Sequence, residues 1–369
     1  MRSLPATFFV FWILLSATIT GAAASGHPPE APASSGDDTE IDLDLLGSSA
    51  WGADAALAER VGENLRWALD GSARIGWSSG DADWIGVEAL GLDLFTVISG
   101  KTRDLVRINL QLYGVRADTG QSHPYAFDGD GKWKFQPRNS FVDLLILPRG
   151  QMTLRAGHFE LPYGIEAYVD TNGTLRQYTI GRELGEKTDW GVALTGSAAK
   201  FEWIASLSRG SGNEWNGSGD PWLALGRVAT PVERAAGIGF TVAGGDVRVG
   251  GQGPPSSRWR AAVDGRVHFL GFDLLGEITG GFNEKNPQIS GIVELDWTDS
   301  TGDLLTYFQA FPQWRRQGGK SNTGAEFRAG LLWRLLTGLS LSAEVRQVAA
   351  PIGDGGHPTT FFTQVRYRR

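Results

Sequence analysis

Two histidines are the residues of this chain best suited to proton transfer, because histidine gains and loses a proton near neutral pH. His158 and His268 both fall in strand-like segments, and neither has a serine or aspartate partner at the spacing of a nucleophilic motif such as G-x-S-x-G. The DGDG segment at 128–131 begins like a calcium loop but lacks the rest of the twelve-residue ligand set. We therefore expect neither an enzyme nor a metal site.

The composition narrows the chemistry further. The 369 residues include no cysteine, which excludes disulfides, thiolate metal sites and haem attached through CxxCH. The net charge is −7 and there is no basic block, so nucleic acid is not an expected partner. The sequence therefore predicts a chain without a cofactor of its own.

Charged and apolar side chains alternate over long stretches. Between 258 and 269, Arg258, Arg260 and Arg266 fall on even positions, whereas Trp259 and Phe269 fall on odd ones. Because successive side chains of a strand point to opposite faces, this pattern predicts a strand with one polar and one apolar face. Sixteen such segments are predicted, at 64–78, 84–97, 104–115, 140–148, 151–159, 188–197, 200–209, 221–229, 235–245, 257–269, 272–282, 288–298, 303–314, 323–335, 339–349 and 359–368.

These strands are long enough to cross a membrane. Most have 9 to 14 residues, against about 5–6 in globular sheets and about 9–11 in tilted transmembrane strands. Pairs of aromatic residues lie ten positions apart on the apolar face, which spans roughly 25 Å and suits the aromatic girdles of a membrane barrel. The predicted girdle residues are Trp67, Trp77, Trp259, Phe269, Phe272 and Phe282. We expect an all-β fold, a transmembrane antiparallel β-barrel of about 16 strands, with 14 or 18 strands and a soluble secreted β-sandwich as alternatives.

The first 63 residues differ from the rest. Residues 1–24 combine Arg2, an apolar run and an A-x-A cleavage site, which predicts a cleaved signal peptide. Residues 25–63 are rich in proline, serine, glycine and acidic residues and predict a flexible periplasmic tail with room for one short helix. After position 30 no comparable apolar run exists, so if the mature chain lies in a membrane, its residues 64–369 have to form a barrel.

The predicted connections alternate between short and long. Turns after even-numbered strands are short, whereas loops after odd-numbered strands include 116–139 and 160–187. Outer-membrane barrels have short turns at one rim and long loops at the other. The 160–187 loop contains many aromatic and apolar residues, so we expect it to fold into the lumen and bring Glu166, Asp170 and Arg176 to a constriction. The 116–139 loop is a second candidate lid.

Two segments suggest a family. Residues 157–166 are GHFELPYGIE and residues 189–196 are DWGVALTG. In order and spacing they resemble the phosphate-selective porin O/P-like group of outer-membrane porins, which carries G-x-F-x-x-P-[FY]-G-x-E, a long loop and then R-D-x-G-x-x-x-x-G. The first motif is matched by Gly157, Phe159, Pro162, Tyr163, Gly164 and Glu166. Two features differ: Thr188 replaces the usual arginine before Asp189, and the lysine-rich pore ladder of the phosphate-selective members has no counterpart.

The resemblance implies a function. Such barrels are often trimeric, lie in the outer membrane of Gram-negative bacteria and pass small anions or other hydrophilic solutes by passive diffusion. The implied partners are outer-membrane lipid, small solutes or anions, and further copies of the chain in a homotrimer. The alternative is the sheath of a porin–cytochrome electron conduit, in which a separate multihaem cytochrome sits and docks on 25–63.

Charged residues on the polar face would line the lumen. The alternation directs eleven basic and ten acidic side chains inward, so the arrangement of these charges would set ion preference. We expect Arg258, Arg260 and Arg266 to form an anion-attracting strip. The alternative is that they pair with carboxylates of neighbouring strands and stiffen the wall. The candidate lining and constriction residues are Arg155, Glu166, Asp170, Arg176, Arg258, Arg260, Arg266, Arg328 and Arg346.

Overall fold

The computed structural model describes most of the chain after residue 63. The described residues are 64–80, 83–118, 130–147, 151–169, 171, 173–198, 200–215, 219–232, 234–249, 253–351 and 356–369. The signal peptide at 1–24, the tail at 25–63 and Asp170 lie outside them. None of the helices in this part of the chain has the length and apolarity that a membrane-spanning helix needs.

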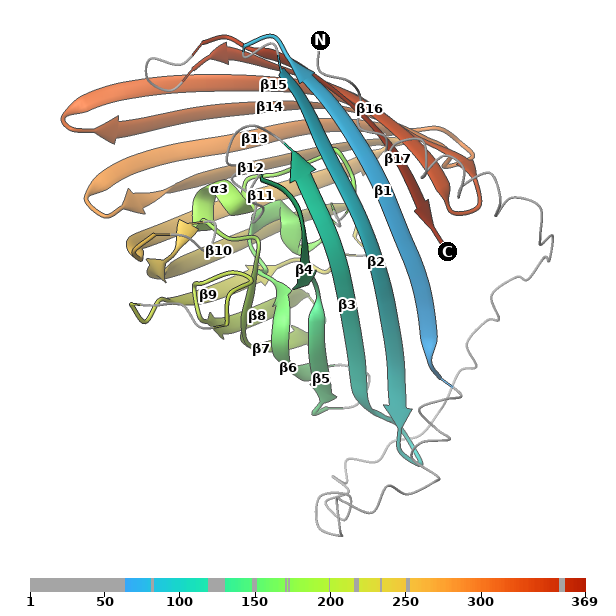
Figure 1. The fold of residues 1–369 in the computed structure, drawn as a ribbon. Helices are drawn as coiled ribbons and strands as arrows, with labels where there is room; N and C mark the ends of the chain where they lie inside the picture. Colours follow the sequence, from blue (N-terminus) through green and yellow to red (C-terminus); the bar gives the residue numbers. More distant parts are fainter. Residues whose placement is uncertain are drawn as a thin grey trace. The chain divides into compact units, whose positions relative to one another are not determined.

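The described residues form one closed antiparallel sheet. Its strands are β1 (Arg66–Ser78), β2 (Asp83–Ser99), β3 (Asp104–Asp118), β4 (Asp130–Pro137), β5 (Ser140–Leu145), β6 (Met152–Glu160), β7 (Thr188–Ala198), β8 (Phe201–Ser208), β9 (Trp222–Ala229), β10 (Ala236–Val247), β11 (Ser256–Phe269), β12 (Phe272–Asn283), β13 (Asn286–Thr298), β14 (Leu304–Gln317), β15 (Lys320–Leu336), β16 (Leu339–Ala350) and β17 (Thr359–Arg368). Because β4 and β5 both pair with β3, they share one position in the wall, which is interrupted at Arg138 and Asn139. The fold is therefore the sixteen-stranded barrel that the alternation predicts (Figure 1).

The barrel closes where its first strand meets its last. β1 pairs with β17 from Asp70 opposite Arg368 to Ser78 opposite Thr360. Nε of Arg366 donates to Oδ1 of Asp70 over 2.9 Å, although the two residues are 296 positions apart in the sequence. We call this β1–β17 junction the seam.

Alternation along each strand separates an apolar outside from a polar inside. On β11, Trp259 is 57% exposed on the outer face, whereas its neighbours Arg258 and Arg260 point inward and are 8% and 3% exposed. Trp259 lies opposite Phe282, and Phe269 lies opposite Phe272, so aromatic residues of adjacent strands meet on the outside. The two faces are those that the sequence predicts.

The predicted 116–139 loop is wrong at both ends. β3 continues to Asp118, and β4 begins at Asp130 and pairs with β3. The alternation of Lys132, Trp133, Lys134 and Phe135 already has the period of a strand, and it directs Phe135 outward with 88% exposure. The glycines and aspartates before it masked this signal.

The core lies inside the barrel, between the wall and the 161–187 segment that connects β6 to β7. We call this segment the lumen loop; it contains a short 3₁₀ helix, η3 (Gly164–Ala167), and α3 (Ile180–Leu184). Its apolar side chains pack on lumen-facing residues of β9 to β14 in two clusters. The first contains Leu161, Tyr163, Ile180, Leu184, Leu223, Leu225, Ala243, Val247 and Ala262, and the second contains Ile165, Tyr178, Leu275, Ile292 and Phe311. Burying each large side chain contributes about 1.5–3 kcal/mol, so the loop is firmly attached.

Candidate functional site

The lumen loop enters the barrel through the segment that resembles the porin motif. Phe159 and Tyr163 are 1% and 0% exposed, and the Tyr163 hydroxyl lies 3.0 Å from Oγ1 of Thr279 on β12. The backbone N–H of Ile165 donates to Oε2 of Glu277 over 3.0 Å. These contacts attach the start of the loop to β12, on the lumen side of the wall.

Gly164 allows this attachment, because its φ of +54° is a left-handed conformation and a side chain there would collide with the Glu277 carboxylate. We expect Gly164→Ala to lower the free energy of unfolding by about 2 kcal/mol or more, from backbone strain and the lost Glu277 contact. Urea titration of the folded protein measures this. Gly318→Ala is the matched control, since Gly318 has a φ of +59° with open space around it. Equal losses in the two variants would contradict the role of Glu277.

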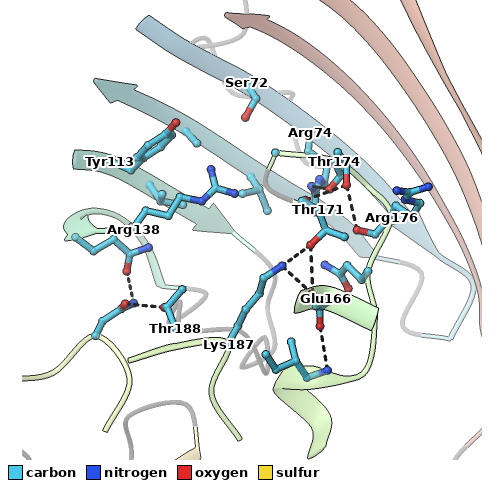
Figure 2. A pocket seen from close by; sticks show the side chains of 18 of the residues that line it. Ser72, Arg74, Tyr113, Arg138, Glu166, Thr171, Thr174, Arg176, Lys187 and Thr188 are labelled. Atoms are coloured by element: carbon cyan, nitrogen blue, oxygen red, sulfur yellow. Dashed lines mark hydrogen bonds and ion pairs between the residues drawn. The ribbon is translucent and has the colours of Figure 1, made fainter. Parts of the chain in front are cut away.

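Glu166 is the centre of the loop's polar contacts. It accepts hydrogen bonds from Nζ of Lys187 over 2.9 Å and from the backbone N–H of Ile180 over 3.1 Å. Burial lowers the pKa of Lys187, but the carboxylates of Glu166 and Glu160 outweigh burial and hold that pKa above its ordinary value. Lys187 therefore stays protonated at neutral pH and ties the end of the lumen loop to its beginning (Figure 2).

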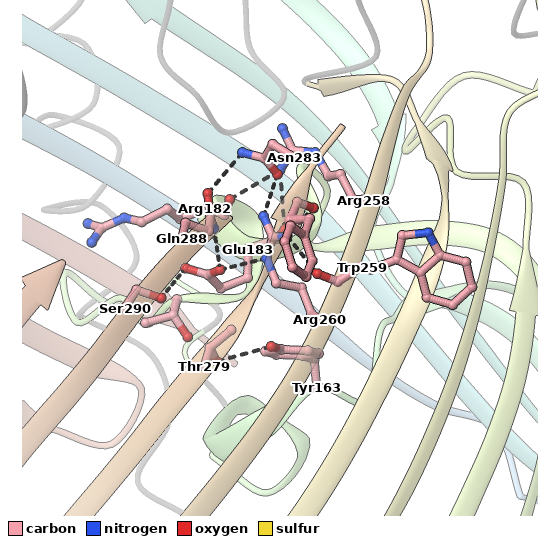
Figure 3. A network of polar contacts seen from close by, with 12 residues as sticks. Tyr163, Arg182, Glu183, Arg258, Trp259, Arg260, Thr279, Asn283, Gln288 and Ser290 are labelled. Atoms are coloured by element: carbon pink, nitrogen blue, oxygen red, sulfur yellow. Dashed lines mark hydrogen bonds and ion pairs between the residues drawn. The ribbon is translucent and has the colours of Figure 1, made fainter. Parts of the chain in front are cut away.

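The helix α3 is attached by one buried carboxylate. Nε of Arg260 donates to Oε2 of Glu183 over 2.8 Å, and both side chains are fully buried. Glu183 also accepts from Gln288 over 2.8 Å and from Ser290 over 2.5 Å, so donors from two strands converge on it (Figure 3). Arg258 donates to the carbonyl oxygens of Arg182 and Glu183 at the end of α3.

These contacts correct the predicted anion-attracting strip. Arg258 and Arg260 lie behind α3 rather than on the open lumen, because the lumen loop covers them and supplies their acceptors. Arg266 donates to the carbonyl oxygens of Pro231 and Val232, and its guanidinium lies 4.9 Å from the Tyr168 ring centre. The alternative, in which these arginines stiffen the structure by pairing, fits Arg260, although its partner is on the loop rather than on a neighbouring strand.

The other predicted arginines are also paired. Arg176, on the lumen loop, contacts Glu294 at 3.1 Å and Asp296 at 2.5 Å on β13. On the wall, Arg155 contacts Asp143 at 2.8 Å, Arg328 contacts Glu326 at 2.6 Å, and Arg346 contacts Glu344. Most of the charge that the alternation places inside the barrel is thus neutralised locally.

Two larger cavities lie in the lumen, one on each side of the loop. The first, of about 230 Å³, lies toward the long-loop rim and is lined by residues that include Arg74, Thr174 and Lys187. The second, of about 530 Å³, lies toward the short-turn rim and is lined by residues that include Arg107 and Arg155. Both cavities are lined by Tyr113, Arg138 and Glu166. We call these three residues the constriction.

Arg138, where the wall is interrupted between β4 and β5, forms one side of the constriction. The Arg138 guanidinium lies 5.1 Å from the centre of the Tyr113 ring. Its carbonyl oxygen lies 2.5 Å from Nδ1 of His158, which is buried, and its N–H donates to the carbonyl of Gln111. Figure 2 shows Arg138 and Lys187 reaching toward the same space. His158 therefore positions the backbone of a constriction residue, whereas exposed His268 contacts Asp273 at the short-turn rim.

Sequence reasoning did not predict Tyr113, Arg138 and Lys187 as cavity-lining residues. Pro137 interrupts the strand alternation immediately before Arg138, and this was the available signal. Glu166 was predicted at the constriction and lines both cavities. In the described part of the chain, no three His, Cys, Asp or Glu side chains come together to hold a metal ion.

The six predicted girdle residues all lie on the outer face. Trp67, Trp259 and Phe282 are at least half exposed. Trp77 stacks on Phe361 with ring centres 6.3 Å apart, and Phe269 stacks on Phe272 at 5.8 Å.

Comparison with known proteins gives the fold a context. No protein-family model and no curated protein sequence matches the chain. OprB of Pseudomonas putida superimposes with a TM-score of 0.64 at 9% identity, covering 85% of this chain and 96% of OprB. The chain has the fold of outer-membrane porins. An anion-selective porin from Comamonas acidovorans has a TM-score of 0.60 at 12% identity, covering 83% of this chain and 99% of that porin. Salmonella typhi OmpF, in complex with daunomycin, has a TM-score of 0.61 at 11% identity, covering 83% and 98%.

Proposed function

We propose that this chain is an outer-membrane porin through which small hydrophilic solutes diffuse passively. The observation that carries this proposal is the lumen loop, which lies inside the barrel and leaves a cavity on each side, both lined by Tyr113, Arg138 and Glu166. The apolar outer face, with its exposed aromatic residues, suits a lipid environment. The fold shared with the anion-selective porin of Comamonas acidovorans supports the same assignment.

The finer parts of the proposal rest on separate observations. The motif at 157–166 supports a relationship to the O/P-like group, and residues 1–24 support export to the outer membrane. A homotrimer is proposed by analogy with the trimer form of Vibrio cholerae OmpT, whose TM-score to this chain is 0.58. Anion preference is proposed because Arg74 and Arg138 both line the first cavity.

A cytochrome sheath is a weaker proposal. The lumen loop occupies the space that a multihaem cytochrome would need, and its Tyr163 and Leu184 are fully buried against the wall. A cytochrome inside would have to displace these contacts.

Planar-bilayer recording of the purified mature chain tests the porin proposal. We expect discrete conductance steps and a reversal potential that favours anions in a salt gradient. Arg138→Gln should change the anion-to-cation permeability ratio about fivefold toward cations, because a unit charge at contact distance contributes about 1 kcal/mol even in water. Arg334→Gln is the control, since Arg334 bonds the carbonyl of Gly302 at the short-turn rim. Absence of any conductance would refute the porin proposal. An unchanged anion-to-cation permeability ratio in Arg138→Gln would refute the proposed role of Arg138 in anion selectivity.

A further inference from the structure

The lumen side of β2 and β3 carries an apolar patch. Val87, Ala89 and Val115 all line the first cavity. Val87 lies opposite Arg74 in the β1–β2 register, and Ala89 lies opposite Val115 in the β2–β3 register, so the three side chains point inward together. The interior of a transmembrane barrel that conducts water is ordinarily polar. Contact with water therefore does not explain why apolar side chains stand at these three lumen-facing positions.

A cation borders this patch. Nη2 of Arg74 donates to Oε1 of Gln364 over 2.9 Å and to the carbonyl oxygen of Thr174 over 2.9 Å. Within the described part of the chain, none of the hydrogen-bond or ion-pair partners of Arg74 is a carboxylate, in contrast to Arg155 and Arg260. Lys187 and Arg138 line the same cavity, as do Asp70, Glu166 and Glu186; of these carboxylates, Glu166 is paired with Lys187 and Asp70 with Arg366. The cavity thus combines an apolar wall with a charged wall that includes Arg74, Arg138 and Lys187, which Figure 2 labels.

This combination selects among anions and neutral solutes. Inorganic phosphate could satisfy the cations but would gain nothing from the apolar patch, and a sugar would leave hydroxyls against Val87 and Val115 without partners. A carboxylate with a hydrocarbon body satisfies both walls at once. The cavity of about 230 Å³ is smaller than the pockets of about 300–1,000 Å³ that hold drug-sized ligands, which limits the solute to a small one.

We propose that the first cavity is a binding site for small organic monocarboxylates with an apolar body, such as aryl carboxylates. The carboxylate contacts Arg74, and the ring lies on Val87, Ala89 and Val115. This inference rests on the proposed porin function in that the site would lie on the permeation path, but binding itself does not require conduction.

Two measurements on the full mature chain test the site. The first is block of single-channel current by added benzoate, compared with acetate, which lacks the apolar body, and with benzyl alcohol, which lacks the charge. We expect benzoate to reach half-block at about a tenfold lower concentration than acetate, because it buries a ring as well as a carboxylate. The second is calorimetric binding of benzoate to the detergent-solubilised barrel, which detects the site whether or not the channel conducts.

Matched variants separate the two walls of the site. Arg74→Gln should weaken benzoate binding about tenfold by removing a charge-assisted contact. Val87→Thr, which keeps the shape but adds a hydroxyl, should weaken benzoate binding about fivefold and leave acetate unaffected. The controls are Arg334→Gln and Val97→Thr, the latter ten positions along the same face of β2. Both controls should bind benzoate as the parent chain does.

The outcomes distinguish this inference from the porin proposal. Benzoate binding without conductance would refute the porin and keep the site. If the chain conducts but binds benzoate and acetate with equal affinity, the porin proposal stands and the binding site is refuted. The same holds if Val87→Thr and Val97→Thr bind benzoate with the same affinity.

Discussion

Replacing Glu183 by alanine is expected to lower the free energy of unfolding by about 3–5 kcal/mol, the largest stability effect that the structure predicts. Glu183 and Arg260 are both fully buried, so the variant leaves a guanidinium in the barrel without its carboxylate. Gln288 and Ser290 lose the same acceptor. Urea titration of the folded protein, followed by circular dichroism, measures the loss.

Two controls bracket the Glu183 prediction. Glu183→Gln keeps the size and one acceptor oxygen and should recover part of the stability. Glu214→Ala removes an ion pair with Arg248 at 3.2 Å in which Glu214 is 57% exposed, so its cost should be about 1 kcal/mol or less. A Glu183→Ala variant no less stable than Glu214→Ala would show that α3 is not attached through this residue.

Deletion of residues 171–182 is expected to have the largest effect on conduction. These residues include Arg176, which contacts Glu294 and Asp296, and they line the first cavity. Without them the lumen beside the constriction widens, so single-channel conductance should rise by about twofold or more. The measurement is planar-bilayer recording, after circular dichroism has established that the β-structure is retained.

The deletion needs a control for chain length. Removing an equal number of residues from the tail, 30–41, should leave conductance unchanged, since the tail precedes β1 in the sequence. An unchanged conductance after deletion of 171–182 would mean that the lumen loop does not limit the flow of ions. A lower conductance would mean that the remainder of the loop collapses into the pore.

The barrel could be predicted from the sequence because the direction of each side chain depends only on its position along its own strand. Each strand places outward-facing and lumen-facing residues on alternate positions. The faces of Trp259 and Arg260 can therefore be predicted without knowing which strands lie beside theirs. The same rule applied to Lys132 and Phe135 would have found β4, had the glycines and aspartates before it not indicated a loop. The loop's place inside the lumen followed from its many apolar residues.

The constriction was less predictable because it depends on contacts between distant segments. Alternation shows that Arg258 and Arg260 point inward, but not that α3 covers them, because a five-residue helix has no distinct sequence signal of its own. Arg138 stands where Pro137 ends one strand, and its direction is set by the backbone contacts of the interruption. Predicting such positions requires the three-dimensional pairing as well as the period.

The seam has a consequence for how the molecule forms. Asp70 and Arg366 come from opposite ends of the barrel sequence, so β1 cannot acquire its second partner until the last strand has been synthesised. Contacts between such distant residues slow folding, because the entropy of closing the chain is lost before the contacts form. Until the seam closes, β1 has an unpaired edge, and such edges invite aggregation. The barrel can therefore close only after its final strand has been synthesised.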